Sequence, residues 1–336
     1  MSVAASTSAD RDLFEHAKGY YVAKALLALW RTGLLARAAA AETLDVAALS
    51  RDGYDPDLLG ALLDYLTARG YFDWLDDGRY RLSARGHAAA PFFGYLPMMI
   101  GAYEPVFTNL EAVVSGRLTY GRDVERSGHE LAGSLTALEQ NLLGQVTEML
   151  GAEPFRRALD LGCGSARMLC RICQLDPAVS GVGVDVDEVA CAAARRTVEE
   201  QRLSGRVTIV QGDAGDVGEL PAAAIEGVDL VTGMFVMHEL LRQRGRDGTV
   251  ACLRELARLV GTGGKLLLVE VARTTGHDAQ DGLLFVPEYE LFHRFSNQRL
   301  ATRAEWEEIL GEAGIRLVRT VPADMCQAIC MVATPA

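Results

Sequence analysis

The spacing of apolar residues divides the chain into two stretches of different character. From residue 11 to about residue 145, apolar positions recur at helical intervals, beginning with a run that ends near Gly33. Residues 45–50 and 56–69 predict two further helices, and Asp55 is the expected N-cap of the second. We therefore expect the N-terminal stretch to be mainly helical.

A hairpin signal interrupts this helical stretch. Residues 71–75 and 79–83 alternate between apolar and polar around an Asp-Asp-Gly turn at 76–78. Helices followed by a two-stranded hairpin are typical of a winged helix, which often binds DNA. Residues 11–85, however, hold ten basic and eleven acidic side chains, and DNA binding requires a basic face. We therefore expect residues 11–145 to be a dimerisation and substrate-covering domain without a nucleic-acid partner.

The pattern changes from residue 156 onward, where short aliphatic runs alternate with helical segments. This alternation predicts an α/β fold with a doubly wound, mostly parallel sheet and helices on both faces. The expected strands cover 157–161, 182–186, 207–211, 228–232 and 265–271, and the expected helices cover 166–174, 188–203 and 248–259. Two final runs, 315–321 and 326–333, predict an antiparallel pair at the sheet edge. Residues 146–336 therefore form the expected seven-stranded catalytic domain.

Composition narrows the class of protein. The chain has 336 residues, of which 49% are hydrophobic, so it can bury a substantial core. Its net charge of −12 argues against nucleic acid or an anionic membrane as the main partner. Seven scattered cysteines favour reduced thiols, and the N-terminus lacks the apolar core of a signal peptide. Residues 88–103 are apolar but broken by Pro and Gly. We expect a cytoplasmic protein with no membrane partner.

A glycine-rich turn follows the first strand of the second domain. Its sequence, Asp160-Leu-Gly162-Cys-Gly164, lets the backbone approach a ligand closely. Asp185 ends the next strand, where an acid can accept both hydroxyls of a ribose. Asp213 ends the third strand and is expected to face the amino group of an adenine. Together these residues predict a nucleoside site.

The charges around the turn indicate which nucleoside. Arg167 replaces the third glycine of dinucleotide-binding proteins, and the Asp160 carboxylate would repel a pyrophosphate. The same carboxylate suits the ammonium group of S-adenosylmethionine, which has no phosphate. The motifs resemble those of class I methyltransferases, which implies S-adenosylmethionine as cofactor. Val186, Ala214 and Met234 complete the expected donor site.

His238 and Glu239 follow the fourth strand, at the edge of the sheet where ligands bind in such folds. With the winged-helix domain in front, the whole chain resembles the O-methyltransferases of plants and bacteria. The resemblance implies that His238 is a general base, since an imidazole titrates near the working pH. It also implies a homodimer formed through the N-terminal helices.

A second histidine, His293, lies in a polar segment after the fifth strand. His238, Glu239 and His293 compose a 2-His-1-carboxylate set, which suits a divalent metal such as iron or zinc. Farther along, Asn297-Gln298 replaces the glycine pair of the phenol-methylating enzymes. The alternative for His293 is a hydrogen-bonded core histidine.

The spacing Glu290-x-x-His293, followed by Glu305-Trp306, resembles the metal-dependent α-keto acid C-methyltransferases of the phenylpyruvate type. Glu239 departs from that family, which has Asp there. The resemblance implies methylation of the β-carbon of a small-molecule 2-oxo acid, with a metal that stabilises the enolate. It also implies that Arg122, in Tyr120-Gly-Arg-Asp, holds the substrate carboxylate.

Three alternatives remain open from the sequence. His238 can act without a metal as the base of an O- or N-methyltransferase. A methyltransferase fold can also direct the donor to intramolecular cyclisation. Finally, the chain can be a regulator that binds the donor without catalysis.

Overall fold

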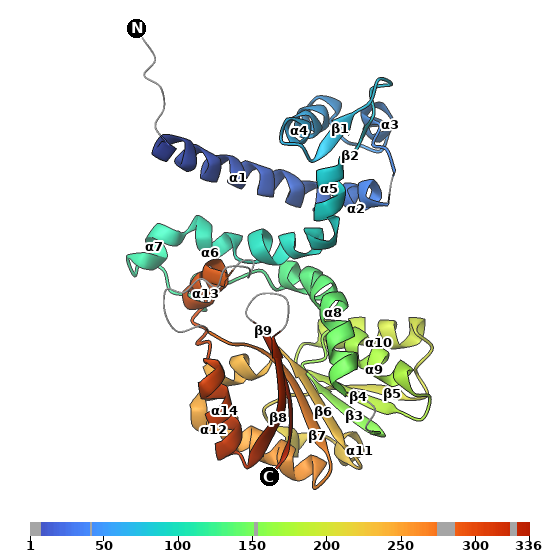
Figure 1. Ribbon diagram of the computed structural model, residues 1–336, viewed down its shortest axis with the longest axis vertical. Helices are drawn as coiled ribbons and strands as arrows, with labels where there is room; N and C mark the ends of the chain where they lie inside the picture. Colours follow the sequence, from blue (N-terminus) through green and yellow to red (C-terminus); the bar gives the residue numbers. More distant parts are fainter. Residues whose placement is uncertain (1–7, 41, 151–153, 274–285, 323–327) are drawn as a thin grey trace. The chain divides into compact units, whose positions relative to one another are not determined.

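The computed structural model describes residues 8–40, 42–150, 154–273, 286–322 and 328–336. The chain divides into two compact units (Figure 1). One comprises Met1–Leu110 and Glu125–Leu138, and the other Glu111–Val124 and Glu139–Ala336. The sequence places the boundary near residue 145, whereas the second unit also takes in the connecting segment Glu111–Val124.

The first unit contains the helices and the hairpin expected from the sequence. Asp55 caps α4, because its carboxylate accepts the backbone N–H groups of Asp57 and Leu58 at 3.0 Å each. Strands β1 and β2 pair antiparallel, as predicted. The elements are α1 (Ser8–Arg31), α2 (Leu34–Ala39), α3 (Val46–Arg51), α4 (Pro56–Ala68), β1 (Phe72–Trp74), β2 (Tyr80–Leu82), α5 (Ala84–Ala89), two short turns of helix (Ala90–Tyr95 and Pro97–Ala102) and α6 (Glu104–Thr108). Helices α7 (Leu110–Val114) and α8 (Gly128–Leu150) each contribute residues to both units.

The second unit is built on a seven-stranded sheet with the order β5-β4-β3-β6-β7-β9-β8. Its strands are β3 (Arg157–Leu161), β4 (Ser180–Asp185), β5 (Val207–Gln211), β6 (Leu230–Met234), β7 (Lys265–Val271), β8 (Ile315–Pro322) and β9 (Ala328–Pro335). Strands β3 to β7 are parallel, and β9 runs antiparallel to both β7 and β8. The predicted fold class and the antiparallel C-terminal pair are confirmed.

Helices cover both faces of this sheet (Figure 1). The helices of the unit are α9 (Arg167–Leu175), α10 (Glu188–Glu200), α11 (Ala222–Ile225), α12 (Met237–Val260), α13 (Val286–Phe295) and α14 (Arg303–Glu312), with a 3₁₀ turn at Val217–Glu219. Leu169 and Val198 of α9 and α10 are buried in one apolar cluster. Leu253 and Trp306 of α12 and α14 are buried in a second cluster, and the Trp306 indole donates to the Val271 carbonyl at 3.1 Å. This bond ties α14 to the end of β7.

Helix α12 begins earlier than the sequence pattern predicts. The expected helix over 248–259 is only its second part, because α12 starts at Met237 and includes His238 in its first turn. Gly245, at φ 66° and ψ −175°, breaks the helical path between the two parts. The polar, glycine-containing run before Gly248 conceals the periodicity of the first part.

Two further observations bear on expectations from composition. None of the helices in the described ranges is both long and apolar enough to cross a lipid bilayer. The cysteines of those ranges are free thiols with buried side chains, namely Cys163, Cys170, Cys173, Cys191, Cys252 and Cys330.

Candidate functional site

The residues expected to bind the donor follow neighbouring parallel strands at one edge of the sheet. Leu161 at the end of β3 is in register with Val184 of β4 and Gly233 of β6. Asp185 at the end of β4 is in register with Gln211 at the end of β5. The carboxyl ends of these strands therefore form a common rim, which is where open α/β sheets bind ligands.

The glycine turn after β3 has the backbone geometry that only glycine adopts readily. Gly162 and Gly164 have φ values of 62° and 52°. A Cβ atom on Gly162 would lie 2.4 Å from Cγ2 of Val236, just before α12. The Gly164 N–H donates to Oδ2 of Asp185 at 2.9 Å, which fixes the turn against the end of β4.

Asp160 is a buried carboxylate next to this turn. It is 4% exposed, and its Oδ1 accepts a hydrogen bond from the Thr232 hydroxyl at 2.6 Å. Burial raises the pKa of Asp160 to about 7; the Thr232 bond opposes this shift and the negative charge of Asp185 adds to it. A cationic group at this point would compensate the buried charge and favour ionisation.

Two other residues expected to bind S-adenosylmethionine, Asp185 and Asp213, already accept hydrogen bonds from backbone N–H groups. Asp185 Oδ1 accepts the Asp187 N–H at 3.0 Å, and Val186 beside it is 68% exposed. Asp213 Oδ1 accepts the Gly215 N–H at 2.8 Å. Ala214 follows Asp213, and Met234 ends β6; both are partly buried. The exposed valine beside Asp185 offers an apolar surface to a planar ring.

An arginine of α12 holds the loop that carries Asp213. Arg244 donates to Asp213 Oδ2 at 2.9 Å, to both carboxylate oxygens of Asp216 at 2.6 and 2.7 Å, and to the Gly215 carbonyl at 2.9 Å. Arg244 thereby lowers the pKa of Asp216. A Cβ on Gly215 would lie 2.5 Å from the guanidinium carbon, so glycine allows the arginine to pack onto the loop backbone.

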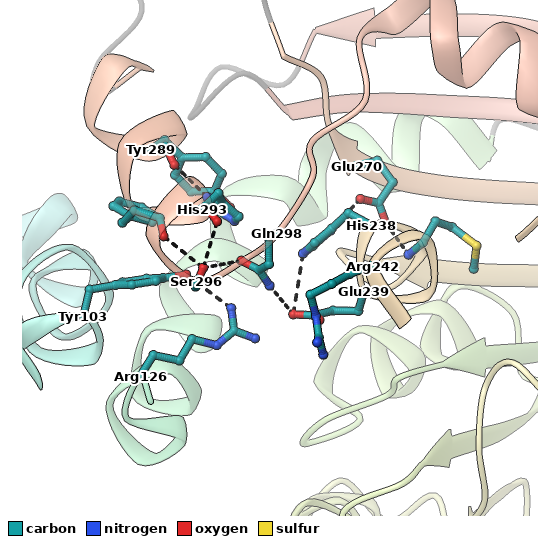
Figure 2. Close-up of polar contacts among 12 residues, drawn as sticks. Tyr103, Arg126, His238, Glu239, Arg242, Glu270, Tyr289, His293, Ser296 and Gln298 are labelled. Carbon is teal, nitrogen blue, oxygen red and sulfur yellow. Dashed lines mark hydrogen bonds and ion pairs between the residues drawn. The ribbon is translucent and has the colours of Figure 1, made fainter. Parts of the chain in front are cut away.

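His238 is oriented by a glutamate that the sequence reading did not identify. Glu270 of β7 is fully buried, and its carboxylate accepts the Met237 N–H at 2.6 Å and lies 2.8 Å from Nδ1 of His238 (Figure 2). Because a carboxylate accepts, Nδ1 of the neutral imidazole carries the proton and Nε2 carries the lone pair. His238 is therefore arranged to present Nε2 as a base or a ligand.

His293 has a matching arrangement on α13. It is 3% exposed, and its Nδ1 lies 2.7 Å from the carbonyl oxygen of Tyr289, one turn earlier (Figure 2). A carbonyl only accepts, so Nδ1 is the protonated nitrogen of the neutral ring here as well. The rings of His238 and His293 meet edge to face, with 5.9 Å between their centroids.

Glu239 completes the trio but has other partners. One of its carboxylate oxygens accepts from the Gln298 side-chain amide, and the other accepts from Arg242 at 3.0 Å (Figure 2). The distance from Glu239 Oε1 to Nε2 of His238 is 4.0 Å. In the part of the chain that the structure describes, no three His, Cys, Asp or Glu side chains are arranged to hold a metal ion. The structure thus brings the expected ligands close to one another without forming a closed metal centre.

Arg122 has a different environment from the one expected. Its side chain is 70% exposed, and its guanidinium pairs with the adjacent Asp123 at 2.7 Å, which raises the pKa of Arg122. Its expected role in holding a substrate carboxylate stays a prediction.

Sequence reasoning assigned no role to four residues around the site, because each contacts a site residue from a distant part of the chain. Glu270 left the clearest signal, since it is a single acid in the otherwise aliphatic run of β7. A carboxylate in a buried strand requires a hydrogen-bond donor nearby. The other three are ordinary polar residues in sequence, namely Thr232, Arg244 and Gln298.

The comparisons with known proteins agree with this geometry. A family model described as a methyltransferase domain matches residues 158–264, which run from β3 to the start of β7. That match covers the glycine turn, the donor acids and His238. These residues therefore form a methyltransferase domain, which supports an S-adenosylmethionine-dependent methyltransferase as the enzyme.

Two curated methyltransferases resemble the chain over most of its length. The 2-ketoarginine methyltransferase of Streptomyces arginensis is 27% identical over 91% of this chain and 89% of its own. The indolepyruvate C-methyltransferase of Streptomyces griseus is 24% identical over 76% of this chain and 74% of its own.

Among solved structures, the mitomycin 7-O-methyltransferase MmcR is similar with a TM-score of 0.70 at 17% identity, over 98% of both chains. At that identity the likeness concerns the fold. The methyltransferase therefore has the architecture of the O-methyltransferases, while two curated relatives are named for 2-oxo acids.

Proposed function

We propose that this methyltransferase transfers the methyl group of S-adenosylmethionine to the β-carbon of a small 2-oxo acid in natural-product biosynthesis. The names of two relatives support this acceptor class, because 2-ketoarginine and indolepyruvate are both 2-oxo acids. The observation that carries the proposal is the pair of imidazoles, His238 and His293, with centroids 5.9 Å apart and each with Nδ1 facing an oxygen acceptor.

The nitrogen atoms that this pair of histidines offers as ligands suit a divalent metal such as iron or zinc. Two imidazole Nε2 atoms and a carboxylate make the 2-His-1-carboxylate set, and oxygen acceptors behind the imidazoles are the outer contacts that such ligands need. We propose that His238, Glu239 and His293 hold the ion after Glu239 turns away from Gln298 and Arg242. When bound, the ion supplies a Lewis acid for the keto oxygen of the acceptor.

On the donor side, the protein contributes charge and alignment. The Asp160 carboxylate is proposed to accept the donor's ammonium group, while Asp185 accepts the ribose hydroxyls and Asp213 the adenine amino group. Gly162, Gly164, Val186, Ala214 and Met234 surround the same rim. Methyl transfer then requires the acceptor carbon in line with the departing sulfur at roughly 3–3.5 Å.

The direct test is incubation with a carbon-13-methyl donor and a panel of acceptors. The panel contains 2-ketoarginine, indolepyruvate, short aliphatic 2-oxo acids and simple phenols, each with and without a chelator. Mass spectrometry detects the gain of one methyl group, and carbon NMR distinguishes a methyl on carbon from one on oxygen or nitrogen. We expect C-methylated 2-oxo acids and no methylated phenol. Methylated phenol with no reaction of any 2-oxo acid would reject the proposal.

The metal role has its own test. Protein prepared without a histidine tag should contain near-stoichiometric divalent metal. His293→Ala should lose both the metal and C-methylation while its affinity for S-adenosylhomocysteine stays within twofold of the wild type. If the variant changes neither metal content nor turnover, His293 is a packing residue.

A second candidate is O- or N-methylation without a metal, and the His238–Glu270 pair favours it. In that reaction Nε2 of His238 takes the proton from the acceptor hydroxyl or amine as the methyl is transferred. The buried Glu270 carboxylate stabilises the imidazolium that forms, as the acid does in other carboxylate–histidine pairs. Full activity after chelation, with His293→Ala unaffected, would support this alternative.

We also propose a homodimer formed through the N-terminal helices. Helix α1 exposes large apolar side chains, with Leu13, Phe14, Tyr20 and Tyr21 each 62–70% exposed. Such a row of apolar residues on one helix suits association with a second copy. Light scattering of the purified protein measures its mass and tests the expectation.

A further inference from the structure

A polar cavity of about 290 Å³ lies beside α13, within the unit that contains the sheet. His293 and Gln298 contribute to its wall. The ring of His293 also meets the ring of His238, and the side-chain amide of Gln298 donates to Glu239. The cavity therefore borders the proposed acceptor site. Its volume is at the lower end of the range for small-molecule pockets, so it suits a small group rather than a large ring system.

The wall of this cavity is rich in arginine, and its arginines differ in how well they are paired. Arg294 is 69% exposed and pairs with Glu290 at 3.4 Å. Arg299 is 78% exposed and pairs with Glu305 at 3.1 Å. Both are surface ion pairs of modest strength.

Arg273 is the third arginine, and its pairing is the loosest. Its side chain is 30% exposed, and its distance to the Glu305 carboxylate is 3.8 Å. Its Nε donates to the Leu300 carbonyl at a long 3.4 Å. Because Arg273 is the least exposed of the three, an anion that binds to it loses less of the attraction to screening by water.

The backbone holds Arg273 at a functional position. It lies two residues after the end of β7, the strand that carries Glu270, and therefore on the rim where ligands bind. Its N–H donates to the Ala301 carbonyl at 2.8 Å, so its backbone is fixed to the segment that follows α13. A side chain that starts from a fixed backbone needs less ordering when it binds a ligand.

We propose that Arg273 binds the carboxylate of the acceptor in this cavity. The planar guanidinium can form two parallel hydrogen bonds to a carboxylate, which fixes the acceptor's orientation as well as its position. The inference rests on the proposed function, because it requires an acceptor with a carboxylate beside the reacting carbon. It assigns to Arg273 the contact that the sequence resemblance assigned to Arg122.

The test separates carboxylate recognition from donor binding and from folding. Calorimetry follows 4-methyl-2-oxopentanoate, and separately its neutral analogue 4-methylpentan-2-one, titrated into protein saturated with S-adenosylhomocysteine. Arg273→Gln should weaken binding of the oxo acid roughly 10- to 100-fold, in line with loss of a charged hydrogen-bonded pair, and leave the ketone unchanged. In turnover, KM for the oxo acid should rise more than kcat falls.

Arg303→Gln is the matched control, because Arg303 lies on α14 outside this wall and its exposed side chain pairs with Glu307 at 2.9 Å. It should change oxo-acid affinity by less than twofold. Arg273→Lys keeps the charge without the planar fork and should show an intermediate loss, and it serves as the criterion if Arg273→Gln does not fold. Thermal unfolding and affinity for S-adenosylhomocysteine report on folding.

The outcomes distinguish this inference from the proposed function. If the wild type binds and methylates 2-oxo acids but the Arg273 variants match it, the inference is wrong and the proposed function stands. If the wild type binds no 2-oxo acid under any condition of the panel, the proposed function is wrong, and so is the inference that rests on it.

Discussion

Two carboxylates are buried at the carboxyl edge of the sheet, and they differ in their hydrogen-bond partners. Asp160, where we propose that S-adenosylmethionine binds, is 4% exposed and accepts a hydrogen bond from the Thr232 hydroxyl at 2.6 Å. Glu270, beside His238, is fully buried and has both the Met237 N–H and the His238 imidazole as hydrogen-bond partners. One neutral donor leaves a buried charge poorly compensated, and the pKa of Asp160 rises to about 7.

This difference indicates two different functions for a buried acid. Each oxygen of the Glu270 carboxylate has a hydrogen-bond partner. Glu270 can therefore act as a fixed support that sets which nitrogen of His238 carries the proton. Among the residues that the structure describes, no positive side chain pairs with Asp160, so a ligand can supply the missing charge. We propose the ammonium group of S-adenosylmethionine as this partner, because its binding would compensate the buried carboxylate of Asp160.

The largest effect is expected from removing the charge of Glu270. Met237 and His238 bond to different oxygens of Glu270, and in Glu270→Gln one of these oxygens becomes an NH₂ group that cannot accept. An NH₂ group facing Nδ1 would move the ring proton to Nε2 and remove the lone pair there. We expect kcat to fall about 100-fold, in the range known for outer contacts of catalytic histidines. Steady-state turnover at saturating donor measures it.

Glu308→Gln is a suitable control for this variant, because Glu308 lies on α14 and pairs with Arg246 at the surface. Its turnover should equal that of the wild type. A Glu270→Gln enzyme within threefold of wild-type kcat would show that the buried pair does not orient His238 for the reaction.

A smaller effect is expected from Asp160→Asn, and it should have opposite signs for binding and stability. The amide can still accept from Thr232 but carries no charge for the donor's ammonium group. Affinity for S-adenosylmethionine should fall roughly 10- to 100-fold. The donor-free variant should be more stable than the wild type at pH 8, because it buries no charge. Calorimetry and thermal unfolding measure the two effects, and exposed Asp176→Asn serves as the control.

The pH dependence follows from the same raised pKa. An aspartate in the unfolded chain loses its proton near pH 3.8, whereas Asp160 in the folded protein keeps it until about pH 7. Its contribution to the free energy of unfolding is therefore present below pH 3.8 and is lost as pH rises to about 7. Donor affinity should rise between pH 6 and 8, as Asp160 ionises. Asp160→Asn should remove both trends, and their persistence in this variant would assign them to another group.

The smallest effect is expected from Arg244, which acts on the donor side from a distance. Arg244→Gln should loosen the loop that carries Asp213 and reduce donor affinity about threefold to tenfold, because the guanidinium is partly exposed. Arg246→Gln is the matched control, since Arg246 lies beyond the Gly245 break and pairs with α14. Equal donor affinities in the two variants would show that the Arg244 contacts are incidental.

The sequence predicted the strands well because each is a short aliphatic run between turns. The expected ranges 157–161, 207–211 and 265–271 coincide with β3, β5 and β7. The start of α12 was missed because charged residues and Gly245 interrupt its apolar periodicity. Local pattern therefore identifies an element reliably where burial imposes a regular period on the sequence, and less reliably where the element carries functional polar residues.

The partners of the site residues depend on strand order, which the sequence pattern does not encode. Strand β3 is adjacent to β6, so Thr232 is in register with Asp160 although 72 residues separate them. Strand β7 is adjacent to β6 in turn, which brings Glu270 to His238 from 32 residues away.

The amino-acid sequence by itself determined the α/β class of the second domain, the glycine turn after β3 and the acids that follow the strands, because these depend on local periodicity and on the special backbone freedom of glycine. The tertiary structure alone decided that Asp160 is buried with the Thr232 hydroxyl as its partner, that Glu270 supports His238, and that Arg273 lines the cavity beside His293. The physical reason is that compensation of a buried charge is a property of spatial neighbours, and the folding of the sheet selects those neighbours from distant parts of the chain.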